Sequence, residues 1–252
     1  SSDDNERTLG VAWGDVDGDG DLDLAVANAR TVNTSLQTGG GQNKLYINEN
    51  GVLQNPAVWA SKEFEDTRSV AWGDVDGDGD LDLAAGNGLN PNRVYLNENG
   101  QLQRKAYWFS LDQDDTYELI WADIDGDGDL DLFAANSNGP NKIYLNENGT
   151  LNPTAVWQSD PTSATGAAIG DVDGEGDLDI ATSQVNLSNG NGQANLLYHK
   201  GSPAHPLTPG QSEAINIVLQ FAGDPNSLAP AAGFATPAIR DGLIPLSYTL
   251  YH

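Results

Sequence analysis

The chain has 252 residues and a formal net charge of −26, because 37 acidic residues stand against 11 basic ones. This imbalance argues against nucleic acid and anionic membranes as partners, since both require a basic surface. No run of 18 apolar residues is present, so no membrane-inserted segment is expected. Repulsion between like charges opposes compaction of so acidic a chain, and bound cations would relieve it. Cys is absent, which fits chance, a reducing compartment, or a fold clamped by metal in place of disulfides.

Four similar segments follow one another along the chain, and each contains an Asp-rich loop. They read GVAWGDVDGDGDLDLAVAN from Gly10, SVAWGDVDGDGDLDLAAGN from Ser69, ELIWADIDGDGDLDLFAAN from Glu118 and GAAIGDVDGEGDLDIATSQ from Gly166. The first Asp of each loop recurs at intervals of 59, 49 and 48 residues. The longer first interval holds a Gly/Asn/Thr-rich insertion near residues 31–41, which is expected to form a surface loop. Repeats of this period predict an array of similar supersecondary units.

Each repeat has the pattern of four short antiparallel strands. Val11 and Trp13 share one face before the first loop, and Leu22, Leu24 and Val26 share one face after it. The segments NKLYINENG, NRVYLNENG and NKIYLNENG follow, each with an Asn-Gly pair that predicts a hairpin turn, and aromatic segments (AVWAS, AYWFS, AVWQS) close the repeats. A helical repeat is disfavoured because the apolar segments are short and interrupted by Gly and Asn. The sequence therefore predicts an all-β fold of β-propeller blades.

We expect blades at about residues 7–60, 67–110, 116–158 and 164–200, followed by a Pro/Gly-rich linker at 201–211 and a C-terminal β-strand segment at 212–252. The chain opens within the rhythm of the repeat and has no Met, so we expect it to be a processed or excised piece that once followed upstream blades. Since propellers have four to eight blades, four copies could close a small ring or form half of a larger one.

The C-terminal segment contains two further predicted strands, INIVLQFAG and IPLSYTLYH, and no Asp loop. Two strands do not make a stable domain alone. They could complete the last blade, begin a β-sandwich, or pair with a neighbouring chain by strand addition, which would build a filament. Of these, we favour a partial or strand-complemented β-sandwich.

The Asp loops have the spacing of a calcium site. In the first copy, acids occupy positions 1, 3, 5, 7 and 9, while Gly at positions 4 and 6 lets the backbone curl around an ion. Position 7 normally supplies a backbone carbonyl, so the side chains of Asp21 and its equivalents are expected to face solvent. Position 12 is Val26 in a β-like run and not the bidentate Glu of an EF-hand. Solvated acidic turns and magnesium are the disfavoured alternatives, because all four copies keep the spacing and Mg²⁺ rarely uses an all-protein cage.

The motif DVDGDGDLD, preceded by AWG and followed by a Tyr-Leu-Asn strand, resembles the FG-GAP/VCBS repeat and is similar to the calcium-binding blades of integrin α-subunit propellers. The resemblance covers about residues 1–200 and implies a propeller with about four Ca²⁺ ions in the hairpin loops, all on one face. It departs from integrins in copy number, since those propellers have seven blades. The C-terminal segment bears a weaker resemblance to the start of an Ig-like module. The ligands implied are Asp15, Asp17, Asp19, Asp21 and Asp23; Asp74, Asp76, Asp78, Asp80 and Asp82; Asp123, Asp125, Asp127, Asp129 and Asp131; and Asp171, Asp173, Glu175, Asp177 and Asp179.

Signals for catalysis are scarce, so we expect a protein that is not an enzyme. The chain has no Cys and no GxSxG, HExxH or Walker-type motif. Its three His residues do not recur in the repeat. The recurring tryptophans are interpreted as core residues between packed sheets, with sugar-stacking platforms as the alternative. They are Trp13, Trp72 and Trp121 before the loops, and Trp59, Trp108 and Trp157 near the ends of the blades.

Taken together, these features predict a secreted, extracellular or cell-surface module that is rigidified by calcium and is structural or adhesive. Its expected partners are other protein subunits, surface ligands or glycans, and a homo-oligomer or filament is one possible assembly. The alternatives are a lectin-like carbohydrate-binding module and the accessory domain of a secreted enzyme.

Overall fold

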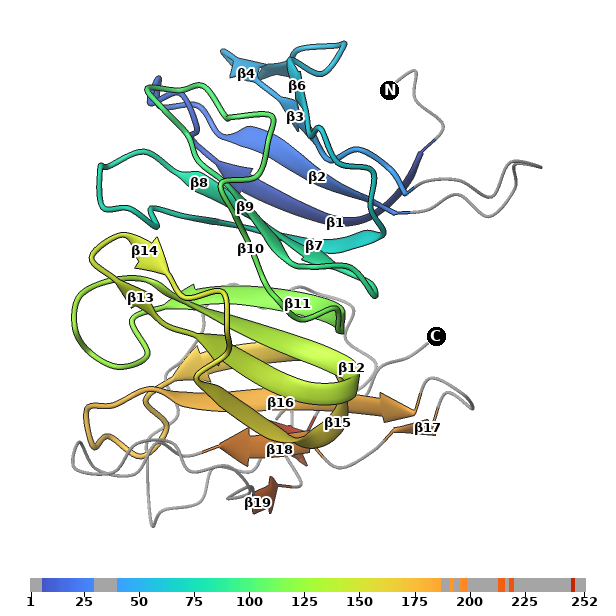
Figure 1. Ribbon diagram of the computed structural model, residues 1–252, viewed down its shortest axis with the longest axis vertical. Helices are drawn as coiled ribbons and strands as arrows, with labels where there is room; N and C mark the ends of the chain where they lie inside the picture. The colour runs from blue at the N-terminus through green and yellow to red at the C-terminus, as the bar shows by residue number, and fades with distance from the viewer. Residues whose placement is uncertain are drawn as a thin grey trace, which may run out of the picture.

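The computed structural model describes residues 6–29, 40–186, 191–192, 195–198, 213–215, 218–219 and 246–247 (Figure 1). All regular elements in these ranges are β-strands. No helix in the described part of the chain is long and apolar enough to cross a membrane. Most of the predicted insertion near residues 31–41 and the whole predicted linker lie outside the described residues.

The strands of the first two repeats are β1 (Arg7–Gly14), β2 (Asp23–Ala29), β3 (Lys44–Tyr46), β4 (Asn48–Glu49), β5 (Val52–Leu53), β6 (Trp59–Ala60), β7 (Thr67–Gly73), β8 (Asp82–Asn87), β9 (Arg93–Tyr95) and β10 (Trp108–Phe109). Those that follow are β11 (Asp115–Ala122), β12 (Asp131–Tyr144), β13 (Asn146–Glu147), β14 (Thr150–Leu151), β15 (Trp157–Gly170), β16 (Asp179–Asn186), β17 (Asn191–Gly192), β18 (Asn195–Tyr198), β19 (Glu213–Ile215), β20 (Val218–Leu219) and β21 (Leu246–Ser247).

Each repeat forms an antiparallel meander, which confirms the predicted all-β blades. The first blade has the strand order β1-β2-β3-β6, and the second has β7-β8-β9-β10. Small hairpins, β4-β5 and β13-β14, follow the third-strand position. The third and fourth blades share one sheet of order β11-β12-β15-β16-β18-β19, because β15 is the last strand of the third blade and continues as the first strand of the fourth.

The blades stack along the long axis of the molecule, as Figure 1 shows. The first strands of successive blades, β1, β7, β11 and the second half of β15, are neighbours in this stack. The first and fourth blades lie at its opposite ends, so the described residues form an open row of blades and not a closed ring. The loops that follow these first strands all project from the same edge of the stack.

The hydrophobic core lies between the blades. Leu45 and Trp59 of the first blade pack in one cluster with Val70, Leu83 and Tyr95 of the second. The ring of Trp59 meets that of Tyr95 edge to face, with centroids 5.3 Å apart. The pairs Trp108–Tyr144 and Trp157–Tyr198 repeat this contact at the next two joints. Such pairs add stability beyond the area they bury, and the interpretation of these three tryptophans as core residues is confirmed.

A buried polar network, which the sequence analysis missed, crosses each of the first three blades. In the second blade, Thr67 Oγ1 donates to Asn87 Oδ1 (2.7 Å), the Asn87 amide donates to Asn92 Oδ1 (3.0 Å), and the Asn92 amide donates to Ser110 Oγ (3.0 Å). A buried amide is tolerated when its hydrogen bonds are made, and these bonds link all four strands of the blade. The equivalent residues are Thr8, Asn28, Asn43 and Ser61 in the first blade, and Thr116, Asn136, Asn141 and Ser159 in the third.

The C-terminal segment contributes to the fourth blade. Strand β19 pairs antiparallel with β18, with Glu213 opposite Leu197, and so occupies the place of a fourth strand. Strands β20 and β21 pair with each other. For residues 213–215, this pairing favours the alternative in which the segment completes the last blade. The partial β-sandwich over residues 212–252 stays a prediction.

Candidate metal centres

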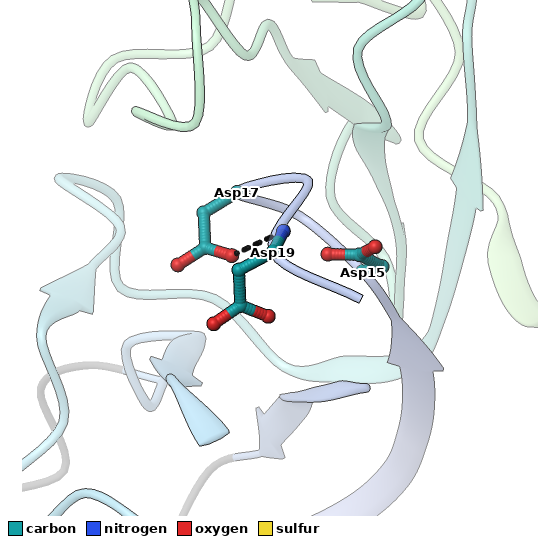
Figure 2. A group of neighbouring side chains, drawn as sticks. All are labelled: Asp15, Asp17 and Asp19. Carbon is teal, nitrogen blue, oxygen red and sulfur yellow. Dashed lines mark hydrogen bonds between the residues drawn. The ribbon is translucent and has the colours of Figure 1, made fainter. Parts of the chain in front are cut away.

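The Asp loops connect the first and second strands of every blade. In the first blade, the loop runs from the end of β1 to the start of β2, and Figure 2 shows Asp15, Asp17 and Asp19 gathered in it. One carboxylate oxygen from each of these residues lies within 4.8 Å of the others. The same grouping occurs for Asp74, Asp76 and Asp78, and for Asp123, Asp125 and Asp127. The structure thus brings together positions 1, 3 and 5 of the first three loops.

The glycines at positions 4 and 6 give the loop its curvature. Gly18 and Gly20 have φ angles of 73° and 95°, which residues with a Cβ rarely adopt. The curled backbone turns its N–H groups inward, where the Gly20 amide donates to Asp15 Oδ2 (3.0 Å) and the Asp19 amide donates to Asp17 Oδ1 (3.3 Å; Figure 2).

The Asp at position 9 is buried and fastens the loop to its blade. Asp82 Oδ2 accepts from the Val75 amide (2.9 Å), and its Oδ1 accepts from the Asn97 amide (2.8 Å). Asp23 and Asp131 make the same pair of bonds in their blades. Burial raises the pKa of Asp82 and of Asp131 to about 6, although these hydrogen bonds lower it in part. The ninth residue thus links the loop to the segment that follows the third strand of the blade, in addition to any part it has in binding a cation.

The expectation that the side chains at position 7 face solvent is wrong. Asp80 Oδ2 accepts a hydrogen bond of 2.7 Å from the backbone amide of Asn99. Asn99 has a positive φ of 54° and begins the Asn-Gly turn that was predicted from the sequence. Asp21 and Asp129 make the equivalent bonds, to the amides of Asn50 and Asn148. The seventh side chain therefore ties the Asp loop to the hairpin of its own blade in the first three repeats.

The fourth loop is arranged differently. Its close group consists of Asp171, Asp173 and Asp179, and the longer Glu175 at position 5 is not a member. Asp177 is buried, and neither of its carboxylate oxygens has a hydrogen-bond partner within the described residues. Glu175 is one methylene longer than the Asp at position 5 of the other loops, and the carboxylate group of this loop is correspondingly different.

The loops fit a hard divalent cation. Their clustered donors are carboxylate oxygens, which are the ligands that Ca²⁺ prefers. The buried oxygen Asp15 Oδ1 has no hydrogen-bond partner in the described part of the chain, so it is free to bind an ion. Calcium there would be held by the residues at positions 1, 3 and 5, and it would supply the positive charge that offsets their mutual repulsion.

A groove of about 490 Å³ follows the first strands of the blades and is lined in part by Arg68, Tyr117 and Glu118. The Arg68 guanidinium pairs with Asp115 (2.7 Å) and lies 4.2 Å from the centre of the Tyr117 ring. Burial raises the pKa of Glu118, whose side chain accepts a hydrogen bond from the Ala167 amide. Arg68 and Glu118 thus both make structural contacts in or beside the groove. His199, His205 and His252 lie outside the described residues.

Comparison with known families agrees with the repeat architecture. The model of the FG-GAP-like repeat matches residues 31–85, 79–134 and 123–182, and that of the FG-GAP repeat matches residues 9–47. No curated protein sequence matches the chain. FG-GAP repeats occur in extracellular or surface proteins, typically as structural or adhesion modules without catalytic activity. Because the matches cover more than half of its length, the chain belongs to the FG-GAP repeat family.

Proposed function

We propose that this protein is an extracellular structural or adhesive module whose blades are rigidified by calcium. The observation that carries the proposal is the recurrence of three carboxylates, with oxygens within 4.8 Å of one another, at the same place in successive blades. Like charges at this distance repel, and a divalent cation among them removes the repulsion. Extracellular modules bind calcium with dissociation constants of roughly 10⁻⁴ to 10⁻³ M, so about millimolar calcium outside the cell would occupy such sites from about half to about nine-tenths of the time.

Calcium titration by isothermal calorimetry tests the metal assignment directly. We expect about four ions per chain, with the fourth loop the weakest because Glu175 lies outside its carboxylate group. Asp17→Asn should remove one ion from the stoichiometry. Asp160→Asn is the matched control, because Asp160 is an exposed acid outside the loops and its loss changes the net charge equally. No heat of binding, or equal stoichiometry for both variants, would refute the assignment.

The adhesive role predicts partners among other protein subunits or surface ligands. A stack of rigid blades presents broad faces and loop edges on which such partners could bind. A pull-down with immobilised protein in calcium, repeated in EGTA, would identify calcium-dependent partners. If EGTA does not affect partner binding, adhesion does not depend on the metal sites.

The carbohydrate alternative has less support. Trp59, Trp108 and Trp157 are buried, and Trp72 and Trp121 are partly buried at the joints between blades. These five tryptophans are therefore poor platforms for sugar stacking. Trp13 is the exception, because 55% of its surface is exposed. A glycan array in calcium would decide, and binding that is abolished in a Trp13→Ala variant would favour the lectin-like function.

A further inference from the structure

The first blade presents an apolar face that is covered in the blades after it. Leu9, Val11 and Trp13 on β1 are 43%, 60% and 55% exposed. Val11 corresponds to Val70 in the second blade and to Leu119 in the third, and both of these are buried against the preceding blade. The face of β1 is thus built like an internal joint but has no blade packed on it within the described residues.

The internal joints show which contacts this face makes when another blade packs on it. At the first joint, Trp72 lies over Gly14 of the preceding blade, where a Cβ atom would be 2.7 Å from Trp72 Cδ1. Its indole Nε1 donates to the Ala12 carbonyl (3.3 Å). Trp121 packs in the same way over Gly73 of the second blade, with the corresponding hydrogen bond to the Ala71 carbonyl.

The third joint differs in a way that confirms this size matching. Ala122 stands where the earlier blades have Gly, Ile169 stands where they have Trp, and both pack against the same core cluster. A Trp therefore accompanies a Gly, and a smaller side chain accompanies an Ala. Close packing makes such matching necessary, because a Cβ in the space of an indole ring would produce a clash.

The fourth blade has a matching surface on the face where, in the earlier blades, the next blade packs. Gly170 occupies the position of Gly14 and Gly73, and a Cβ on it would meet no atom of the described residues within 4 Å. Val172 is 59% exposed, whereas its counterparts Val16 and Val75 are buried beneath the next blade. The face thus offers a place for a tryptophan, and none of the described residues fills it.

One hydrogen bond and one packing contact recur at the internal joints, and the residues at the equivalent positions lie on the two end blades. Asn97 Nδ2 donates to the Val16 carbonyl (2.8 Å), and Asn146 Nδ2 donates to the Val75 carbonyl (2.7 Å). By position, Asn48 on the first blade would donate to the Val172 carbonyl on the fourth.

The hairpin turns supply the other contact. A Cβ on Gly100 would lie 3.1 Å from Asp17 of the preceding loop, and one on Gly149 would lie 3.1 Å from Asp76. For Gly51, the equivalent residue of the first blade, no described atom lies within 4 Å, and its counterpart across the joint would be Asp173.

We propose that the first blade of one copy of this chain stacks on the fourth blade of a second copy, with Trp13 seated over Gly170. A second copy is the partner that the surfaces specify, because the two halves of the joint lie on one chain at opposite ends. Two first-blade faces would not fit each other, since both carry the bulky Trp and neither offers the Gly. The contact is therefore heterologous, and two copies that close on each other make an eight-bladed ring, within the range known for propellers.

Sedimentation velocity on the full chain, over a series of concentrations in calcium, tests this proposal. We expect dimers or larger assemblies, and Trp13→Ala should weaken the association about 30-fold or more, as for other central interface tryptophans. Phe109→Ala is the matched control, because Phe109 is a similarly exposed aromatic (51%) on the outer strand β10 and should change nothing. A wild-type chain that stays monomeric up to its solubility limit would overturn the proposal.

Mixing two variants tests the head-to-tail geometry. Gly170→Phe fills the space over Gly170 (the socket for the tryptophan) but leaves Trp13 in place. Trp13→Ala removes the tryptophan but leaves the socket open. Each variant alone should be monomeric, and an equimolar mixture should form a one-to-one dimer that grows no further. Val172→Lys can replace Gly170→Phe if that variant does not fold. Monomers in the mixture, or dimers of the socket variant alone, would contradict the geometry.

The assembly and the calcium assignment are tested by separate measurements, namely the association state and the thermal stability in calcium. If the chain stays monomeric while calcium still raises its thermal stability, the proposed assembly is wrong and the metal assignment stands. If the chain assembles but calcium does not change its thermal stability, the metal assignment is wrong and the assembly stands.

Discussion

Removal of calcium should lower the thermal stability of this protein strongly. In each of the first three loops, three carboxylates lie with oxygens within 4.8 Å of one another. At that distance, each pair of charges repels by about 1 kcal/mol in a water-like medium, and by more where water is partly excluded. The metal-free loops therefore store repulsion that the folded state must bear, while the unfolded chain can separate the same charges.

The size of the effect follows from binding linkage. If free calcium is ten to a hundred times the dissociation constant, each site contributes roughly 1.4 to 2.7 kcal/mol to the free energy of unfolding. The three loops with the full Asp pattern then contribute about 4 to 8 kcal/mol together. For a chain of this size, 1 kcal/mol shifts the midpoint by roughly 2–4 °C, so the expected change is roughly 10 to 30 °C.

Differential scanning calorimetry in calcium and in EGTA would measure this shift. The buffers should be matched in ionic strength, because added salt also screens the carboxylates. Magnesium at the same concentration should give a smaller shift, since it dehydrates reluctantly and prefers a rigid octahedral site. An unchanged midpoint on addition of EGTA to fully loaded protein would refute the claim that these loops need metal.

Three further predictions concern the blades themselves. Trp72→Ala should cost about 2–3 kcal/mol by opening a cavity at the first joint, whereas Trp13→Ala should change the free energy of unfolding of the monomer by less than about 0.5 kcal/mol; urea unfolding of dilute protein compares them. Asn87→Ala should cost about 2–3 kcal/mol in the same assay, because it leaves buried partners in the polar network unpaired, and a neutral effect would mean that the network adds no stability. Because the folded-state pKa of Glu118 lies above its usual 4.5, the wild type should lose stability as pH rises from 4.5 through that raised pKa. Glu118→Gln keeps the hydrogen-bond acceptor and removes the charge, so its melting temperature should exceed that of the wild type at pH 7.5 but not at pH 4, and equal differences at both values would contradict this account.

The sequence was sufficient to predict the blades and the Asp loops because both depend on local pattern. Alternation such as that of Val11 and Trp13 fixes which side chains share a face, and the Asn-Gly pairs set the hairpins. The clustering of Asp15, Asp17 and Asp19 follows from their alternate spacing around a turn whose glycines permit positive φ. These features need no knowledge of the rest of the chain.

The functions of individual polar side chains were harder to predict. Asp21 and Asp23 belong to the same motif, yet Asp21 accepts from the amide of Asn50 in the hairpin turn, whereas Asp23 is buried and accepts from the amides of Val16 and Asn48. The Asn48 and Asn50 amides that they bind are more than twenty residues away, and no side-chain pattern points to these backbone groups. The Thr–Asn–Asn–Ser network had a signal, since each of its threonines precedes an asparagine by twenty residues in three repeats, but short polar residues also recur in turns.

The tryptophans show why burial could not be assigned from the repeat alone. Trp13, Trp72 and Trp121 occupy the same position in their blades, and only the first is exposed. Trp72 and Trp121 are covered by the preceding blade, and none of the described residues forms a blade before Trp13. Burial thus depends on the neighbouring blade, because the core of this fold lies between the sheets. Similarly, whether β19 pairs with β18 depends on the geometry of the whole fourth blade.

The Asp loops lie where a bound calcium ion would affect the stacking of blades. The first loop contacts the next blade at two points, through the Val16 carbonyl that Asn97 donates to and through Asp17, against which the turn at Gly100 packs. An ion that fixes this loop would therefore fix the surface on which the following blade rests, and its loss would loosen the joint as well as the loop. For a chain with so large an excess of acid, such coupling would make the metal-bound loops a condition for rigid stacking and not only a source of repulsion. The same reasoning extends to the fourth loop, whose joint would be completed by the first blade of a second copy.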